Sequence, residues 1–259
     1  CFLAAGVFSP AARLFHSCRD LIAYTFVYMD MKKILVVQSR TDESRIAGEQ
    51  SHFRAALGAT ADISFLSALD ERLAWSTPDE FLKGIDGVIF GGSSDFDFHG
   101  GRPAKDPARL MSLILLSRTR NIISYTLAQR LPLLGVCFGH QMVAQMHGGE
   151  VDNDAAQSKF GSHEISLTEE GARDPVFGHL PKSFFAQYAH KDSVTTLPSG
   201  ATLLAQSPSC AFSALRYADK AYTVQFHPEV LKFSDIPGGT RESPEASRII
   251  PLWAQYALA

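Results

Sequence analysis

Short apolar runs alternate with longer amphipathic segments from Lys33 onward. Runs of this kind are typical of strands covered on both faces, and those predicted here are Ile34–Gln38, Ala61–Leu66, Gly87–Phe90, Leu133–Val136 and Tyr222–Phe226. Helices are predicted between them over Glu43–Leu57 and Pro107–Gln129, the second capped by Asp106 with proline in the first helical position. The alternation predicts an α/β fold of three layers, with a mainly parallel central sheet between helices.

The stretch from Val151 to Tyr217 follows a different pattern. Polar and apolar residues alternate over short segments such as His163–Leu167, and Leu197-Pro198-Ser199-Gly200 is typical of a turn. We expect a small antiparallel region at one edge of the sheet. After a Gly/Pro-rich piece around Pro237–Gly239, a last helix is predicted to open at Ser243-Pro244-Glu245 and to bury apolar residues, namely Ile249, Leu252 and Trp253.

Residues 1–30 show neither helical nor alternating periodicity. Met31-Lys32-Lys33 leads directly into the first apolar run and is typical of a protein start, so residues 1–30 are predicted to be a non-native or disordered extension and residues 31–259 one domain. A signal peptide is the alternative, but Leu21–Met29 is short, has few basic residues before it and lacks a clear small-x-small cleavage site.

Composition narrows the function classes. A net charge of -3, with both signs mixed along the chain, gives no basic surface for nucleic acid or an anionic membrane. No segment reaches the ~20 apolar residues of a membrane span. Neither a zinc site nor a disulfide framework is indicated, because the cysteines lie far apart: Cys1, Cys18, Cys137 and Cys210. A reducing, cytoplasmic setting is expected.

The segment Leu133–Gln141 joins an apolar strand to a helix through a G-x-C-x-G turn. Such a nucleophile elbow holds its central residue in a strained conformation and requires small residues two positions before and after it, here Gly135 and Gly139. The helix N-terminus also favours a thiolate at Cys137. Taken alone, this pattern fits a small buried cysteine in a turn equally well.

A second candidate is His227-Pro228-Glu229, at the end of the last predicted core strand. Residues two apart in extended backbone point the same way, so Glu229 can orient His227 while the imidazole exchanges a proton with a thiol. Alone, this tripeptide more often marks the end of a strand with a surface carboxylate.

The two motifs, in this order, resemble the class I glutamine amidotransferases of the triad type, over about residues 33–235. The resemblance implies a flavodoxin-like α/β/α fold, the triad Cys137, His227 and Glu229, and hydrolysis of the glutamine side-chain amide through a γ-glutamyl thioester, without a metal or organic cofactor. Gly91-Gly92-Ser93 follows a core strand as the family's oxyanion loop does, which implies that the N–H groups of Gly92 and Phe138 stabilise the oxyanion.

Ala189-His190-Lys191-Asp192-Ser193-Val194 is similar to the family segment that lines the glutamine pocket, although Ala189 replaces the usual serine. The resemblance implies substrate contacts by four residues: Gln141, His190, Lys191 and Asp192.

Within the family the chain looks closest to stand-alone domains related to the glutaminase part of GMP synthase. Neither a synthetase domain nor a GxxxxGK[ST] phosphate loop is present on it. The expected partner is therefore an ammonia-accepting synthetase on a separate chain.

Two alternatives stay open: a hydrolase of γ-glutamyl peptides or conjugates, and a catalytically silent binding module. The loop Ser93–Lys105 is expected to border the site, and its Phe96, Phe98, His99 and Arg102 could set the size of the leaving group. Asp95, Asp97 and His99 are predicted to belong to a solvated lid rather than to a metal site.

Overall fold

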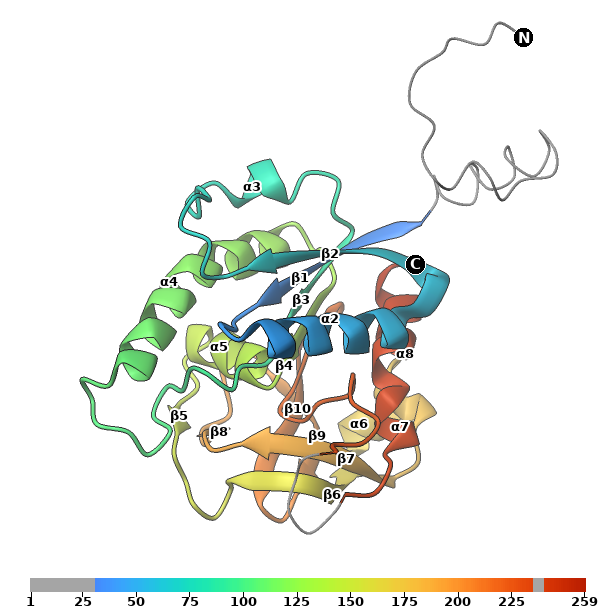
Figure 1. Ribbon diagram of the computed structural model, residues 1–259. Coiled ribbons are helices and arrows are strands. Elements are labelled where there is room, and N and C mark those ends of the chain that lie inside the picture. The colour runs from blue at the N-terminus through green and yellow to red at the C-terminus, as the bar shows by residue number, and fades with distance from the viewer. Residues whose placement is uncertain (1–30, 235–239) are drawn as a thin grey trace, which may run out of the picture.

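The computed structural model describes residues 31–234 and 240–259 (Figure 1). Its main sheet has nine strands in the order β2-β1-β3-β4-β11-β10-β9-β6-β7. The first five are mutually parallel, and each later pair is antiparallel. The strands are β1 (Lys32–Gln38), β2 (Ala61–Ser67), β3 (Gly87–Phe90), β4 (Leu133–Val136), β6 (Lys159–Leu167), β7 (Ser183–His190), β9 (Thr202–Ser207), β10 (Cys210–Ala218) and β11 (Ala221–Val224).

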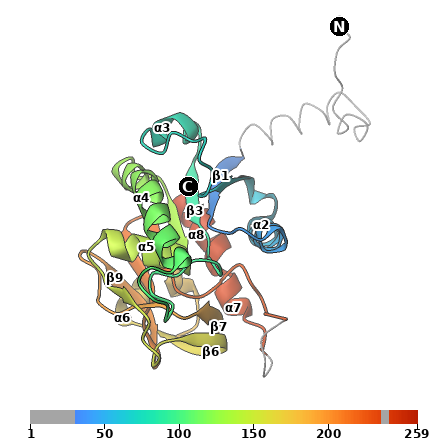
Figure 2. The same cartoon turned by 60° about the vertical axis from the view of Figure 1, so that its left-hand side comes forward.

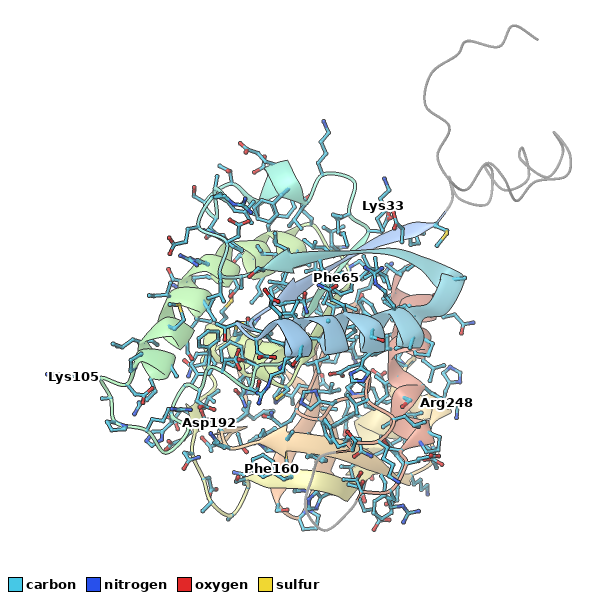
Figure 3. All side chains as sticks on the ribbon, in the orientation of Figure 1. Lys33, Phe65, Lys105, Phe160, Asp192 and Arg248 are labelled. Carbon is cyan, nitrogen blue, oxygen red and sulfur yellow. The ribbon has the colours of Figure 1, made fainter. Side chains whose placement is uncertain are left out.

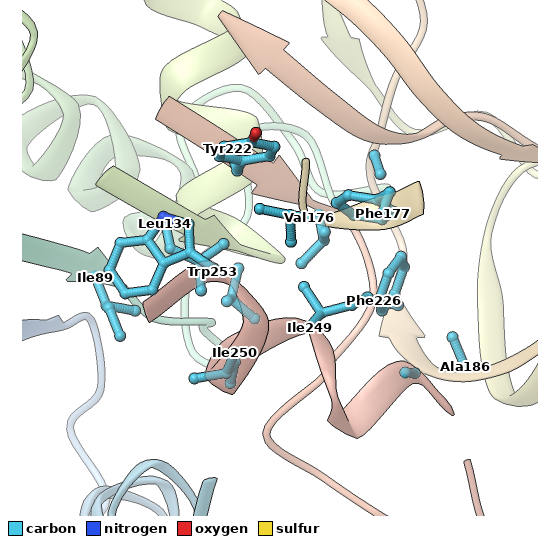
Figure 4. Packing of buried hydrophobic residues seen from close by; sticks show 14 of the residues in the cluster. Ile89, Leu134, Val176, Phe177, Ala186, Tyr222, Phe226, Ile249, Ile250 and Trp253 are labelled. Atoms are coloured by element: carbon cyan, nitrogen blue, oxygen red, sulfur yellow. The ribbon is translucent and has the colours of Figure 1, made fainter. Parts of the chain in front are cut away.

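Helices cover both faces of the parallel half, as Figures 1 and 2 show. Alternate residues of each strand point to opposite faces, which divides the core into two clusters. Ile34 and Val36 face the helices α2 (Glu43–Leu57) and α8 (Ile249–Ala257), where Trp253 fills the centre (Figure 4). Leu35 and Val37 belong to the opposite cluster, which is covered by α3 (Pro78–Phe81), α4 (Pro107–Ala128) and α5 (Phe138–Met146).

The antiparallel half extends the same sheet beyond β11. Short hairpins join β9 to β10 and β10 to β11, whereas α6 (Glu169–Arg173) and a 3₁₀ turn (Phe177–His179) separate β6 from β7 and a longer connection leads from β7 to β9. The two short strands β5 (Val151–Asp152) and β8 (Ser193–Val194) pair apart from the main sheet. This small sheet joins the end of α5 to the turn after β7, beside the carboxyl ends of the parallel strands.

The predicted α/β fold is confirmed, and most elements lie where the pattern placed them. Helix α2 has the predicted bounds, and Asp106 caps α4 by accepting the Ala108 N–H at 2.9 Å. Strand β11 ends at Val224, two residues earlier than predicted. The predicted last helix is two helices, α7 (Pro244–Ser247) and α8, because the chain turns at Arg248.

Two sequence predictions fall outside the described residues. They are the assignment of residues 1–30 as an extension and the Gly/Pro-rich piece Pro237–Gly239. Among the residues that the structure does describe, no helix is long and apolar enough to cross a membrane.

Candidate active site

Cys137 lies at the junction of β4 and α5 with φ 52° and ψ -99°. A positive φ is costly for a residue with a Cβ and persists only where the surroundings enforce it. Two hydrogen bonds do so here: the Cys137 N–H donates to the Val224 carbonyl at 2.8 Å, and its carbonyl accepts the Gln141 N–H at 3.1 Å. The turn therefore presents the sulfur at the N-terminus of a helix, as the sequence predicted for an elbow.

The two glycines of the elbow are required by close backbone contacts. A Cβ on Gly139 would lie 2.4 Å from the Phe90 carbonyl oxygen, and one on Gly135 would lie 2.9 Å from the carbonyl of Gly139. The N–H of Gly139 also donates to the carbonyl of Gly91 at 3.1 Å. Strand β3, strand β4 and helix α5 can pack this closely only when both positions lack a side chain.

His227 and Glu229 follow β11 and face each other. His227 Nδ1 lies 2.7 Å from Glu229 Oε1, and both side chains are buried. Burial alone would lower the pKa of His227, but the negative charges of Glu229 and Cys137 outweigh it and raise that pKa to about 10. The pKa of Glu229 is lowered: burial opposes the shift, and the His227 charge and hydrogen bond dominate. The pair is therefore ionised at neutral pH.

The oxyanion loop brings the nucleophile and the imidazole to one place. A Cβ on Gly92 would lie 2.8 Å from His227 Cε1 and 3.5 Å from Cys137 Cβ, so this position has no room for a side chain. Gln225 Nε2 donates to Cys137 Sγ at 3.8 Å. Two of the residues predicted to form the triad, Cys137 and His227, thus meet at Gly92, and the third, Glu229, contacts His227.

The N–H of Gly92, which is predicted to donate to the oxyanion, already has an acceptor in the protein. Its N–H donates to Glu49 Oε1 on α2 at 3.2 Å. Glu49 is buried and also accepts from Arg40 Nη2 at 2.9 Å and from Gln38 Nε2 at 2.8 Å. A role of this N–H toward an oxyanion therefore requires its release from Glu49, while the amide of Phe138 in the first turn of α5 remains the other predicted donor.

Arg40 and Glu49 are site residues that the sequence reasoning missed. Burial alone would lower the pKa of Arg40, but its main partner Glu49 raises that pKa, and Glu229 and Cys137 lie close enough to raise it further. One signal was available: Glu49 precedes Phe53 and Leu57 at four-residue spacing on α2, and all three are buried. A carboxylate on the buried stripe of a helix requires a charged or hydrogen-bonding partner.

A cavity of about 160 Å³ opens beside Cys137, and Lys191 and Gln141 contribute to its wall. The Gln141 side chain donates to the Asp192 carbonyl at 2.7 Å. His190 is buried, and its Nδ1 lies 3.0 Å from the same carbonyl. The substrate contacts expected of these residues remain predictions, and the cavity places Gln141 and Lys191 where an acyl group bound to Cys137 would lie.

Asp192 is also expected to contact substrate, and its carboxylate makes hydrogen bonds within the protein. Its two carboxylate oxygens accept the N–H groups of His99 at 2.7 Å and Gly100 at 2.6 Å. The side chain therefore anchors the loop that crosses the site. In Figure 3, Asp192 and Phe160, both of which line the small cavity, lie on the side of the molecule from which the loop bearing Lys105 projects.

Residues 95–100 of the loop are buried or half-buried, contrary to the solvated lid expected from its sequence, whereas Gly101 and residues 103–105 are exposed. Phe96 and Phe98 are buried, and the Phe98 ring stacks on Phe138 with a centroid distance of 5.1 Å. Asp95 accepts the N–H and hydroxyl of Thr41 at 2.6 and 2.8 Å. Asp97 accepts from Arg102 at 2.9 Å. Within residues 31–234 and 240–259, no group of three or more His, Cys, Asp or Glu could hold a metal ion.

The family model described as "Glutamine amidotransferase class-I" matches residues 103–234, just over half of the chain and a range that includes Cys137, His227 and Glu229. The chain belongs to the class I glutamine amidotransferase family. A relative from Archaeoglobus fulgidus, named as a glutamine-hydrolysing subunit of GMP synthase, is 31% identical over 156 residues, 60% of this chain and 72% of that protein.

A second class I amidotransferase relative with the same name, from Methanocaldococcus jannaschii, is 36% identical over 116 residues, 44% of this chain and 60% of that protein. The match therefore spans less than two thirds of that relative's length. A solved structure from Thermoplasma acidophilum, described as a putative subunit of GMP synthase, has a TM-score of 0.62 at 22% identity and covers 87% of this chain and 96% of that one. At this identity the likeness shows the shared fold of the amidotransferases.

Proposed function

We propose that this chain hydrolyses the side-chain amide of glutamine to glutamate and ammonia through a Cys-His-Glu triad. The observation that carries the proposal is the 2.7 Å contact between His227 Nδ1 and Glu229 Oε1 beside the strained elbow that holds Cys137. A charged imidazole next to a thiol stabilises the thiolate, the form that attacks an amide carbonyl.

Each step uses groups of the site. Cys137 Sγ forms a bond to the γ-carbonyl carbon, and the charge that develops on the carbonyl oxygen is stabilised by the amide of Phe138 together with that of Gly92 once Glu49 releases it. His227 donates a proton to the leaving nitrogen as the C–N bond breaks. It then takes a proton from the water that hydrolyses the thioester, while Glu229 keeps the ring oriented.

The names of the relatives support a proposal for the acceptor of the ammonia. Their names describe each of them as one subunit of GMP synthase, and we propose that this chain likewise supplies ammonia to a synthetase on a separate chain. A reducing, cytoplasmic setting would keep Cys137 free, as the scattered cysteines lead us to expect. The intact triad argues against a catalytically silent binding module, because a module that only binds has no use for a strained nucleophile.

The test is release of glutamate and ammonia from L-glutamine by the purified full chain. Wild type and Cys210→Ala, which removes the other described buried cysteine, should both release them in equal amounts. Cys137→Ala should reduce the rate by at least about a thousandfold, as loss of a nucleophile does in related chemistry. Equal rates for wild type and Cys137→Ala would contradict the proposal.

A further inference from the structure

Two cavities meet at the triad. Cys137 lines the smaller one, of about 160 Å³, whereas His227 and Glu229 line a second one of about 440 Å³. Ser93, Ser94 and Ala189 contribute to the walls of both, so the two spaces are neighbours. The nucleophile and its acid-base partner therefore lie at the boundary between a small and a large space.

Amide cleavage assigns a different part of the substrate to each space. The acyl group becomes attached to Cys137 and therefore occupies the small cavity. The leaving nitrogen must approach His227 to receive its proton, so any substituent on that nitrogen points into the large cavity. Ammonia has no such substituent. A space of about 440 Å³ instead lies within the range of small-molecule sites, about 300–1,000 Å³.

The charged side chains around the large cavity favour an anion. Arg40, Arg45, His52 and Lys232 contribute to its wall, against the carboxylates of Glu49 and Glu229. Those two carboxylates are already paired, with Arg40 and His227 respectively.

Arg45 and Lys232 are the other two cations of the wall. Arg45 makes a contact of 3.7 Å with Asp95 and is half exposed, and no acidic side chain in the described part of the chain pairs with Lys232. Both line the space that a carboxylate on the leaving amine would enter.

We propose that the large cavity is a leaving-group site and that this chain also cleaves γ-glutamyl amino acids, whose leaving amine carries a carboxylate. The inference rests on the nucleophile of the proposed function. Cys137 Sγ bonds to the γ-carbonyl carbon, the C–N bond breaks, and the amino-acid nitrogen takes the proton of His227. Water then adds to the thioester and gives a proton to His227, Sγ leaves as thiolate, and the products are glutamate and the free amino acid.

The experiment compares three substrates with the full chain: γ-L-glutamyl-glycine, its uncharged isostere γ-L-glutamyl-isobutylamide, and L-glutamine. The readout is kcat/KM for γ-L-glutamyl-glycine divided by kcat/KM for the isobutylamide. A change in the catalytic groups alters both values equally and therefore does not alter this ratio. We expect a ratio of about ten or more, the size of one charge-assisted hydrogen bond. The double variant Arg45→Met/Lys232→Met should lower it about tenfold.

A matched double variant, Arg120→Met/Lys182→Met, removes two exposed cations away from the cavity and should keep the wild-type ratio. Turnover of glutamine without turnover of γ-glutamyl-glycine would overturn the inference and leave the proposed function standing. A ratio near one that neither double variant changes would also overturn it. No turnover of any substrate and no acylation of Cys137 would remove the proposed function as well.

Discussion

Glu49 on α2 accepts the N–H of Gly92 at 3.2 Å, across 43 residues of sequence, and thereby ties a helix of one outer layer to the loop beside the nucleophile. Arg40 and Gln38 also donate hydrogen bonds to this carboxylate. Both carboxylate oxygens of Glu49 therefore accept hydrogen bonds. A buried carboxylate is tolerated only when it is paired and hydrogen-bonded in this way.

Glu49→Ala should destabilise the fold. It leaves the Arg40 charge buried without its partner, which costs about 3–5 kcal/mol in the free energy of unfolding, and it frees the oxyanion loop. Glu169→Ala, which removes one member of an exposed i,i+4 pair, should cost under about 0.5 kcal/mol. Urea unfolding measures both. Similar values for the two variants would show that the Glu49 contact contributes little.

Gly139→Ala should lower the free energy of unfolding by about 2 kcal/mol or more, because its Cβ would lie 2.4 Å from backbone that cannot move without shifting β3. Gly48→Ala is the matched control: it lies inside α2 with no atom within 4 Å of the added Cβ. That change should stabilise the protein by about 1 kcal/mol through helix propensity. The prediction fails if both substitutions shift Tm in the same direction.

Cys137→Gly should be more stable than Cys137→Ala by about 1 kcal/mol. Both lack the thiol, but only glycine adopts φ 52° without a steric penalty. Thermal unfolding of the two variants side by side gives the difference directly. A more stable alanine variant would mean that the elbow does not store backbone strain.

The charged His227–Glu229 pair should make the free energy of unfolding depend on pH. The folded-state pKa of His227 is raised to about 10. The stabilisation that the protonated ring gives the fold is therefore complete below pH 6.5, the ordinary pKa of histidine, and is lost as the pH rises through 10. The free energy of unfolding of wild type minus that of His227→Asn should therefore fall between pH 7 and 10, by at most about 1.4 kcal/mol per pH unit. A difference that stays constant over this range would exclude the charged pair.

Asp192→Asn should loosen the loop over the site. An amide has one acceptor oxygen in place of two, so the N–H of His99 or that of Gly100 loses its partner. We expect faster hydrogen exchange at these two amides and a several-fold rise in KM for glutamine. Asp219→Asn, at an exposed carboxylate, is the control. Unchanged exchange in Asp192→Asn would show that other contacts, such as the Phe98 ring stack and the Asp95–Thr41 hydrogen bonds, hold the loop.

The elements of the parallel half could be predicted from sequence because their signals are local. Leu133–Val136 is an apolar run that leads into G-x-C-x-G, and Asp106-Pro107 marks the start of α4. Each of these signals is contained in a few consecutive residues. The order of the strands is set by pairing between distant residues. The alternating pattern of Val151–Tyr217 did predict antiparallel strands at one edge of the sheet, but their order and their attachment through β11 had no local sign.

The same distinction applies to the site. Cys137 and His227-Pro228-Glu229 could be recognised because each chemical role sits in a short motif. The contacts of Gly92 with Glu49 and of Asp192 with Gly100 join segments 43 and 92 residues apart. Polar groups at such distances acquire their partners only on folding, so the occupied oxyanion N–H and the anchored loop could be seen only in the structure.

The central claim is that Cys137 forms a γ-glutamyl thioester. The most direct measurement mixes the full chain with L-glutamine, quenches in acid during turnover and locates the adduct by mass spectrometry of the digested protein. We predict a γ-glutamyl group on the peptide that contains Cys137, released by hydroxylamine, and none on the peptide that contains Cys210. Glutamate formation without an adduct at Cys137, and with full activity in Cys137→Ala, would contradict the account.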